Sequence, residues 1–511
     1  MTRTLTRGER SLLLLFVMLV TAAVFARSIG FDLIAGREDL AGLRGEPGWR
    51  EHPYPLTWWT WALDRTLWGQ DPRGYHLQSW LWHVLDAGLA FVLLEGLLVV
   101  WARAPRGAAP TGLAAAAGAL FFAIHPLRAE PVAWVSARGD AVSLAFLLLA
   151  LLAYLRARAG RRVAWIALSV ACTALSLLAG AWAITMPALL LVLDAGPLRR
   201  GLGDLRVWLE KAPWAAACAL LVLSLPHQHA EPGQLDPYLH VSALPARVGA
   251  AFHALAFYPW ATLLPLDLLP VYEMAGDERV VLTRFVLGGV IVAVAAGAAW
   301  RLRARAPAVP AALLAYALLV LPAMALAQGG ARATADRCAY ASCVPFAALY
   351  AYAAWRWRAM RLVAVPHLIA LAAIAFVQCG IWRDASTLWT STVERDSQNV
   401  HANLRLGEAE YRAYEASSSR GEREAAAAAL TDALEHLRNA WLRDPRHPRV
   451  LLMRGRSLYA TGREPDVRQA NRLWRQALAL RPTDPDAVAC AELLLASKAR
   501  YPQLFDEPGA K

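Results

Sequence analysis

The chain has 511 residues, of which 57% are hydrophobic, and its mean hydropathy is +0.34. Long apolar runs recur along it, which predicts a polytopic membrane protein rather than a soluble one. The net charge is +12, but the arginines gather in short loops and form no basic stripe interleaved with aromatic residues, so we expect no nucleic-acid partner. The six cysteines include no CxxC pair, so the sequence indicates neither a zinc site nor a disulfide framework.

The apolar runs predict an all-α bundle of about eleven membrane spans, the first of which is a retained signal anchor. We expect these spans at 11–27, 78–101, 113–124, 141–155, 163–179, 183–196, 212–226, 282–300, 309–327, 341–355 and 362–380. Several are shorter than the roughly 20 residues of a straight span, so we expect their ends to run into flanking residues. Segment 247–271 carries three prolines and Asp267, which favours an interfacial or re-entrant segment over a further span.

The distribution of arginine predicts how the chain is oriented. With eleven spans, the arginine-rich loops all fall on the side of the N-terminus, as the positive-inside rule requires. We therefore expect a multi-pass protein of the plasma (inner) membrane with a cytoplasmic N-terminus. The loops expected on the periplasmic, extracytoplasmic side are 28–77, 125–140, 227–281 and 328–340, together with everything after about 381.

After residue 381 the pattern changes to amphipathic helices with polar faces, so we expect a membrane domain at 1–381 and a second domain at 382–511. Helices are predicted at 399–412, 422–443, 449–460, 467–480 and 486–499, with a loop insertion at 416–421. The runs around Pro445 and Pro482 resemble each other at an offset of 37 residues. This offset is close to the tetratricopeptide period of about 34 and favours a short partner-binding repeat domain or spacer. The alternative is two unrelated helices, each ended by a proline.

Ionisable side chains are concentrated between two apolar runs, at the edge of a predicted span. They are His125, Arg128, Glu130, Arg138 and Asp140. Ionisable groups near a bilayer are costly and usually mark a polar cavity or a substrate path. The alternative is an interfacial anchor, in which arginines extend to the headgroups and a tryptophan joins the aromatic belt. The mixture of both signs of charge with histidine favours a site.

Residues 121–154 carry a pattern of His125-Pro126, Glu130, Val-Ala-Trp-Val at 132–135, Arg138 and Asp140. This pattern resembles that of bacterial relatives of the transmembrane and tetratricopeptide-repeat-containing O-mannosyltransferases. These enzymes belong to the GT-C class, which depends on polyprenyl-phosphate sugars. Further likeness lies at 55–83, 185–194, 328–340 and 382–389, so the resemblance covers nearly the whole chain in order.

The resemblance implies a GT-C-like transmembrane bundle and a tetratricopeptide-like repeat domain. It also implies a membrane glycosyltransferase that moves a sugar from a polyprenyl-phosphate carrier to a hydroxyl on the periplasmic or lumenal face. The acceptor would be a protein Ser/Thr or a glycan, presented by the repeats, and membrane lipid would be a further partner. The alternative is a non-catalytic membrane scaffold that recruits partners through its repeats. A transporter is disfavoured because the spans show no internal symmetry and the charges collect at one face.

The resemblance also implies roles for single residues. Asp32 corresponds to the catalytic acid of the first outer loop, where a carboxylate takes the proton of the acceptor hydroxyl; the alternative is a helix or turn cap. Glu130 is the second acid. The candidates for the donor phosphate are Arg128, Arg138, Arg337 and His125, because a guanidinium fork matches phosphate oxygens. The alternative is that the arginines brace loops by pairing with Glu130, Asp140 or Asp336. The candidates for contacts with acceptor or sugar are His76, Asp140, Asp336 and Tyr340.

Three positions depart from the family pattern. Leu33 stands where relatives often carry a second acid, Gly180 stands where a lysine is expected, and Arg128 replaces a usual histidine. The first departure leaves open whether a divalent metal, Mg²⁺ or Mn²⁺, takes part, since these ions prefer several oxygen ligands. The second removes a phosphate contact.

Overall fold

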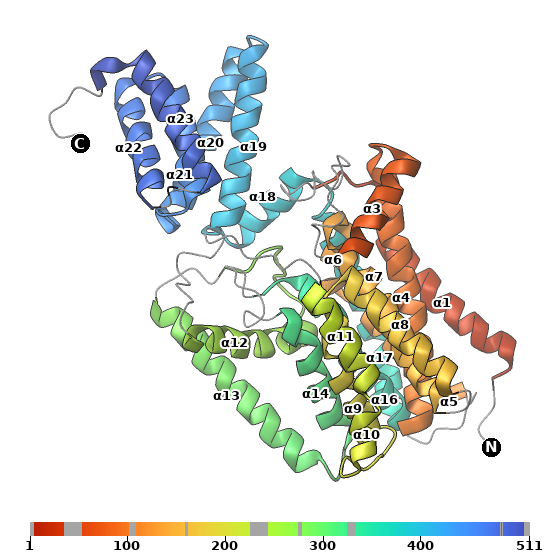
Figure 1. Ribbon diagram of the computed structural model, residues 1–511. Helices are drawn as coiled ribbons and strands as arrows, with labels where there is room; N and C mark the ends of the chain where they lie inside the picture. The colour runs from red at the N-terminus through yellow and green to blue at the C-terminus, as the bar shows by residue number, and fades with distance from the viewer. Residues whose placement is uncertain are drawn as a thin grey trace.

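The structure is a computed structural model that describes residues 5–34, 54–101, 109–158, 162–224, 244–273, 278–323, 334–480, 482 and 484–504. In these ranges the regular structure is helical, with a single isolated antiparallel bridge between Tyr272 and Thr334. Figure 1 shows a bundle of long helices from the first three quarters of the chain and a smaller stack of helices above it from the C-terminal part. The predicted all-α class is therefore confirmed.

A helix lies at each of the expected spans. These helices are α1 (Arg7–Phe25), α4 (Pro72–Trp101), α5 (Ala109–Ala123), α7 (Arg138–Ala157), α8 (Arg162–Ala179), α9 (Met186–Ala195), α11 (Ala212–Ser224), α13 (Glu278–Leu302), α14 (Ala308–Val320), α16 (Val344–Arg356) and α17 (Arg358–Gly380). Six helices of the described chain are long and apolar enough to cross a membrane, and a bent pair, Pro110–Ala123 with Pro126–Ala133, makes a seventh candidate. Others, such as α14, are apolar but shorter, so eleven crossings stay a prediction.

The core of the bundle forms where α4, α5, α7 and α16 pack together on alanine and leucine side chains. Small residues allow the backbones to approach closely, as in other membrane bundles. At Gly118 in α5, an added Cβ would lie 2.7 Å from the carbonyl oxygen of Ala347 and 2.7 Å from the Cβ of Ala351, both in α16. Helix α1 begins with a capping box in which Thr6 and Glu9 each accept a backbone N–H of the other.

Two local predictions need correction. The expected outer loop 28–77 contains helix α3 (Pro55–Trp68), which has proline at its first position and packs against α4 and α8. Residues 416–419 were expected in a loop insertion, but they form the last turn of α19 (Val400–Ser419). The helix ends at Ser419, and Gly421 follows two residues later with a φ of +76°, which favours glycine. The serines at 417–419 were interpreted as loop formers, but Ser417 is buried in the helix instead.

The C-terminal part consists of α18 (Ala385–Arg395), α19, α20 (Arg423–Arg443), α21 (Pro448–Ala460), α22 (Glu464–Leu480) and α23 (Pro485–Arg500). Adjacent helices pack as antiparallel hairpins, α19 on α20 and α21 on α22. Trp474 of α22 is fully buried, and its indole N–H donates to the carbonyl oxygen of Leu452 in α21. This hydrogen bond connects the two helices of the second hairpin. The predicted helices are present, whereas the division at 381/382 and the assignment to tetratricopeptide repeats stay predictions.

Helix α12 (Leu244–Leu263) covers most of segment 247–271, which was predicted to be interfacial or re-entrant. It contains Pro259 and is not among the helices that meet the length and hydropathy expected of a span. In Figure 1 it runs across the picture, whereas α9, α11 and α14 run along the bundle.

Short helices complete the fold: η1 (Ala26–Gly30), η2 (Pro126–Arg128), α6 (Ala129–Ala133), η3 (Val135–Ala137), η4 (Trp182–Thr185), α10 (Leu205–Leu209), η5 (Leu321–Ala323), η6 (Asp336–Cys338), α15 (Ala339–Ser342) and η7 (Pro502–Leu504).

Candidate functional site

The polar stretch 125–140 breaks the bundle into short helical pieces. Helix α5 ends near Ala123, and the chain bends by 57° into η2 and α6 before η3 leads into α7. Proline at 126 and 131 explains the interruption, because neither residue can donate the backbone hydrogen bond that continues a helix. His125 caps the turn by accepting the Leu127 N–H at Nδ1. The polar side chains of this stretch therefore point toward different neighbours rather than along one helical face.

Glu130 and Arg337 form the ion pair at the centre of the candidate site. Glu130 Oε1 accepts from Arg337 Nη1 at 2.9 Å, and Oε2 accepts from the Arg337 backbone N–H at 2.9 Å. The Glu130 side chain is fully buried, whereas 28% of the Arg337 side chain is exposed. Burial opposes the charge of Arg337, but the Glu130 carboxylate holds its pKa above the usual value. The guanidinium therefore stays charged at a partly open position.

Asp140 and Asp336 lie around this pair. The charges of Arg337 and Glu130 both act on Asp140, whose Oδ1 accepts from the indole N–H of Trp182 at 3.0 Å. Asp336 is buried, and its Oδ1 accepts from the Tyr272 hydroxyl at 2.7 Å. Burial raises the pKa of Asp336 well above its usual value, and the neighbouring Glu130 carboxylate raises it further. The structure therefore brings together four of the predicted site residues: Glu130, Arg337, Asp140 and Asp336.

Asp32 lies in a neighbouring segment, and its side chain is exposed. Its backbone N–H donates to the carbonyl oxygen of Arg383 at 2.9 Å, and its own carbonyl oxygen lies 3.3 Å from His76 Nε2. Trp134 joins this segment to the ion pair, since its indole N–H donates to the Ile34 carbonyl oxygen and the Arg337 guanidinium lies 5.3 Å from its ring centroid. Asp32 caps none of the helices that the structure describes, and its catalytic role stays a prediction.

Arg138 is held by internal partners. Its Nη1 pairs with Asp64 Oδ2 at 2.5 Å, and both side chains are buried. Nη1 also donates to Thr60 and Gln78, while Nε donates to Ser79 and Nη2 to the Tyr75 carbonyl oxygen, so the partners come from α3 and α4. Its partner thus differs from the three acids considered in the sequence, and burial raises the pKa of Asp64 while Arg138 lowers it. The geometry favours the bracing alternative for Arg138, which joins α7 to α3 and α4.

Arg128 is also enclosed. Its Nη1 and Nη2 donate to the carbonyl oxygens of Tyr340 and Ala339 at 2.8 and 3.0 Å. The guanidinium lies 5.2 Å from the ring centroid of Phe122 and 5.1 Å from that of Tyr340, which is cation–π geometry. Arg128 is fully buried. It therefore fixes the loop that carries Arg337 rather than presenting a fork to solvent.

The remaining predicted residues point into the protein. His125 Nε2 lies 3.0 Å from the Thr262 carbonyl oxygen, and His76 is buried beside the backbone of Asp32. Tyr340 is fully buried, 2.8 Å from both Asp86 Oδ2 and His83 Nδ1. The Tyr340 hydroxyl belongs to a buried group of three polar residues, which disfavours the predicted contact with acceptor or sugar.

Sequence reasoning assigned no role to three residues of this region. Asp86 could have been noticed as a carboxylate inside the apolar run 78–101, which is unusual for a lipid-facing position. Asp64 and Tyr272 carry no local signal, because each is recognised only by a partner far away in the chain. The alternative considered for Trp134 was an interface anchor, whereas in the structure it lies between the segment of Asp32 and Arg337 and contacts both.

The acids of the site are possible ligands for a divalent metal ion. Within the described ranges, no group of three or more His, Cys, Asp or Glu residues is arranged to hold one. Glu130, the best-placed acid, has both oxygens engaged by Arg337, and a cation at that position competes with a metal ion for the same carboxylate. The described residues around Glu130 therefore do not fit a metal centre.

Comparison with known proteins adds little. No family model and no curated protein sequence matches the chain. Among solved structures, the chain is similar to the crystal structure of ArnT from Cupriavidus metallidurans bound to undecaprenyl phosphate, at 16% identity and a TM-score of 0.35. The similarity covers 98% of this chain and 80% of that one. A TM-score this low does not establish a shared fold, so the functional argument rests on the residues of this chain.

Proposed function

We propose that this protein is a membrane glycosyltransferase of the GT-C type, which moves a sugar from a polyprenyl-phosphate carrier to a hydroxyl acceptor. The observation that carries the proposal is the partly exposed Arg337–Glu130 pair, joined through Trp134 to the segment with the exposed Asp32. A cation and a free carboxylate are what transfer from a phosphate leaving group to a hydroxyl requires. The motifs that resemble the O-mannosyltransferases supply the same two residues, Asp32 and Arg337.

Arg337 is the residue best placed to bind the donor phosphate. Its Nε and Nη2 atoms have no hydrogen-bond partner among the described residues, while Nη1 is fixed by Glu130. A guanidinium held at one corner presents its remaining N–H groups in a fixed direction, which suits phosphate oxygens. Glu130 is then a positioning residue that sets the orientation of the fork.

Asp32 is the proposed base. In the transfer step, the acceptor oxygen forms a bond to the anomeric carbon while the bond from that carbon to the phosphate oxygen breaks. The leaving phosphate takes the electron pair and is stabilised by Arg337. The acceptor proton passes to the Asp32 carboxylate, which is exposed and therefore accessible to a hydroxyl. Proton transfer of this kind contributes roughly 10²–10⁴-fold to rate.

The surroundings of the site fit a lipid-borne donor at the periplasmic face of the inner membrane. The candidate residues follow the ends of apolar helices, which is the level at which a headgroup lies. The acceptor, a protein Ser/Thr or a glycan, would reach Asp32 from the side of the C-terminal helices, since Asp32 hydrogen-bonds the Arg383 backbone just before α18.

A non-catalytic scaffold is the second candidate. One observation favours it: the guanidinium groups of Arg128 and Arg138 are buried and bind to protein partners, so two of the three predicted phosphate-binding arginines act as braces. A scaffold would not need the unoccupied donors of Arg337.

The test is a transfer assay. Purified full-length protein in lipid nanodiscs is incubated with synthetic polyprenyl-phosphate sugars and a hydroxyl acceptor, and released polyprenyl phosphate is measured. Wild type should release carrier, and Asp32→Asn should lose transfer by roughly 10²-fold or more. Asp204→Asn, which affects only the cap of α10, is the matched control and should keep full activity. Absence of release with every donor would contradict the proposal, and full activity of Asp32→Asn would overturn the assigned base.

A further inference from the structure

Segment 268–273, here called the connecting segment, follows α12 and is held by residues at the start of the C-terminal part. The Leu268 carbonyl oxygen accepts from Arg395 Nη1 of α18 at 2.8 Å and from Gln378 Nε2 of α17 at 3.1 Å. The Val271 carbonyl oxygen accepts from Asn399 Nδ2 at 3.2 Å. Three side chains from outside thus satisfy carbonyl oxygens of a segment that has no helix of its own.

Glu273 ends this segment on the N-terminus of α19. Its Oε2 accepts from the Val400 N–H at 2.9 Å and its Oε1 from the His401 N–H at 2.7 Å. The side chain of the N-cap residue Asn399 accepts a hydrogen bond from the Ala402 N–H. Glu273 accepts from the first two N–H groups of the helix, which have no partner within it. A carboxylate at a helix N-terminus is also favoured by the helix dipole. The contact is therefore a strong tie between two distant parts of the chain.

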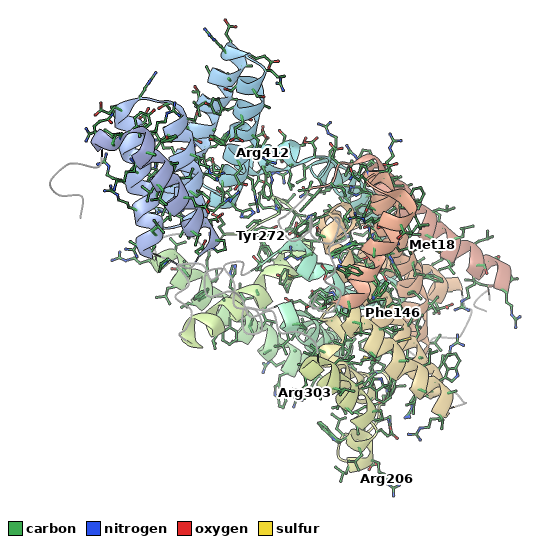
Figure 2. All side chains as sticks on the ribbon, turned by 45° about the horizontal axis from the view of Figure 1, so that its top comes forward. Met18, Phe146, Arg206, Tyr272, Arg303 and Arg412 are labelled. Carbon is green, nitrogen blue, oxygen red and sulfur yellow. The ribbon has the colours of Figure 1, made fainter. Side chains whose placement is uncertain are left out.

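Tyr272, the residue before Glu273, reaches the candidate site. Its hydroxyl donates to Asp336 Oδ1 at 2.7 Å and accepts from the Leu269 N–H at 3.0 Å. Its backbone forms the isolated bridge with Thr334, and its ring packs edge-on against Phe257 at 4.7 Å. Figure 2 places Tyr272 between the helix bundle and the C-terminal helices that carry Arg412. Asp336 directly precedes Arg337, so Tyr272 holds the backbone from which the proposed phosphate ligand projects.

We propose that Tyr272 is a positioning residue of the site and that Glu273 ties it to α19, so that the first helices after the membrane part help to set Arg337. The pathway has three links: α19 holds Glu273, Tyr272 holds Asp336, and the backbone N–H of Arg337 is held in turn by Glu130. The consequence for sugar transfer rests on the proposed function. The mechanical tie itself rests only on these contacts.

Two substitutions break the tie at different points. Tyr272→Phe removes the hydroxyl that joins the segment to Asp336 and leaves the ring packed on Phe257. Glu273→Ala removes both acceptors of α19, and Glu273→Gln restores one acceptor oxygen without the charge. Asp484→Ala is the matched control, because Asp484 caps α23 in the same C-terminal part without contacting the connecting segment.

The first measurement is amide hydrogen exchange on the full-length protein in nanodiscs. Tyr272→Phe should raise exchange in 334–340 by roughly tenfold, the effect of losing about one hydrogen bond. Glu273→Ala should raise exchange both at 400–402 and in 334–340, Glu273→Gln should recover part of the protection, and Asp484→Ala should leave 334–340 unchanged. If 334–340 stays protected in Tyr272→Phe, or if Glu273→Ala affects only 400–402, the proposal is overturned.

The second measurement is transfer kinetics with a polyprenyl-phosphate sugar. Because Asp32 is untouched, Tyr272→Phe and Glu273→Ala should raise KM for the donor by roughly tenfold while kcat changes much less. A roughly tenfold fall of kcat with an unchanged KM would contradict the positioning role. If wild type transfers no sugar, the proposed function fails, and the exchange experiment still decides whether the tie exists.

Discussion

Arg128, Arg138 and Arg337 show that residue type alone does not determine a role. All three follow from the same motif-based prediction, but two are enclosed by carbonyl oxygens or a buried carboxylate, and one is partly exposed. Burying a charge is costly unless partners replace water, so an enclosed arginine is fully committed to its partners. Partial exposure of the side chain therefore separates the ligand candidate, Arg337, from the two buried braces.

Asp336 gives a prediction about pH at the residue scale. Its pKa is raised in the folded protein by burial and then by Glu130, so the folded state holds a proton that the unfolded chain releases near pH 4. Its contribution to stability is therefore fully present below about pH 4 and is lost as the pH rises toward the raised folded value. We expect Asp336→Asn to remove this loss, which amounts to at most about 1.4 kcal/mol for each pH unit.

The measurement is the unfolding midpoint of wild type and Asp336→Asn in the same detergent between pH 4 and pH 8. The unfolding midpoint of the variant should rise relative to that of wild type as the pH increases. If the two unfolding midpoints change in parallel with pH, or if the midpoint of the variant falls relative to wild type as the pH rises, Asp336 is ionised in the folded state.

At this scale the sequence predicted which charged residues matter more reliably than what they touch. Asp32, Glu130, Arg138 and Arg337 were expected to converge around one cavity. Glu130 and Arg337 form an ion pair with Asp140 and Asp336 beside it, whereas Arg138 pairs with Asp64 instead. The partner of Arg138 lies 74 positions away along the chain, and α3, which carries it, was not predicted. Pairing across the fold depends on how helices pack, and no local pattern encodes it.

At the scale of elements, close helix packing depends on glycine at one position in particular. A Cβ at Gly118 would meet backbone of α16, which cannot move aside as a flexible side chain would. We expect Gly118→Ala to lower the free energy of unfolding by about 1–3 kcal/mol through overpacking. Gly297→Ala in α13, where an added Cβ meets nothing within 4 Å, is the matched control. Equal thermal unfolding midpoints for the two variants would mean that α5 and α16 do not pack as described.

Helix positions in the apolar runs could be predicted because a long apolar run determines its own structure in a membrane. Short or mixed segments could not. Helix α3 has a charged and aromatic surface without a clear period, and 416–419 carries serines that favour turns in isolation. In the folded protein, packing of α19 on α20 outweighs that local preference.

At the scale of the whole molecule, charge separates the two ends of the bundle. Figure 2 shows Arg206 and Arg303 at the end far from Tyr272 and from the C-terminal helices. By the positive-inside rule, we expect the end with these arginines to face the cytoplasm. The site and the C-terminal helices would then face the opposite side of the membrane.

Cysteine labelling on intact cells tests this orientation. Five of the six native cysteines are buried, so background labelling should be low. A membrane-impermeant maleimide should label Thr431→Cys, an exposed position in α20, without permeabilisation. It should label Arg206→Cys only after the cells are permeabilised. The reverse pattern would place the site in the cytoplasm and rule out the proposed periplasmic reaction.

The central claim is that the loops around Glu130 and Arg337, together with the segment of Asp32, form one site for the phosphate of a lipid carrier. Its most direct test is the binding of polyprenyl phosphate to full-length protein in nanodiscs, measured by the fluorescence of tryptophans such as Trp134, which contacts Arg337. Wild type should bind, Arg337→Gln should weaken binding by roughly tenfold or more, and Arg206→Gln at the far end should bind as wild type does. Equal affinity of wild type and Arg337→Gln for polyprenyl phosphate would contradict the account.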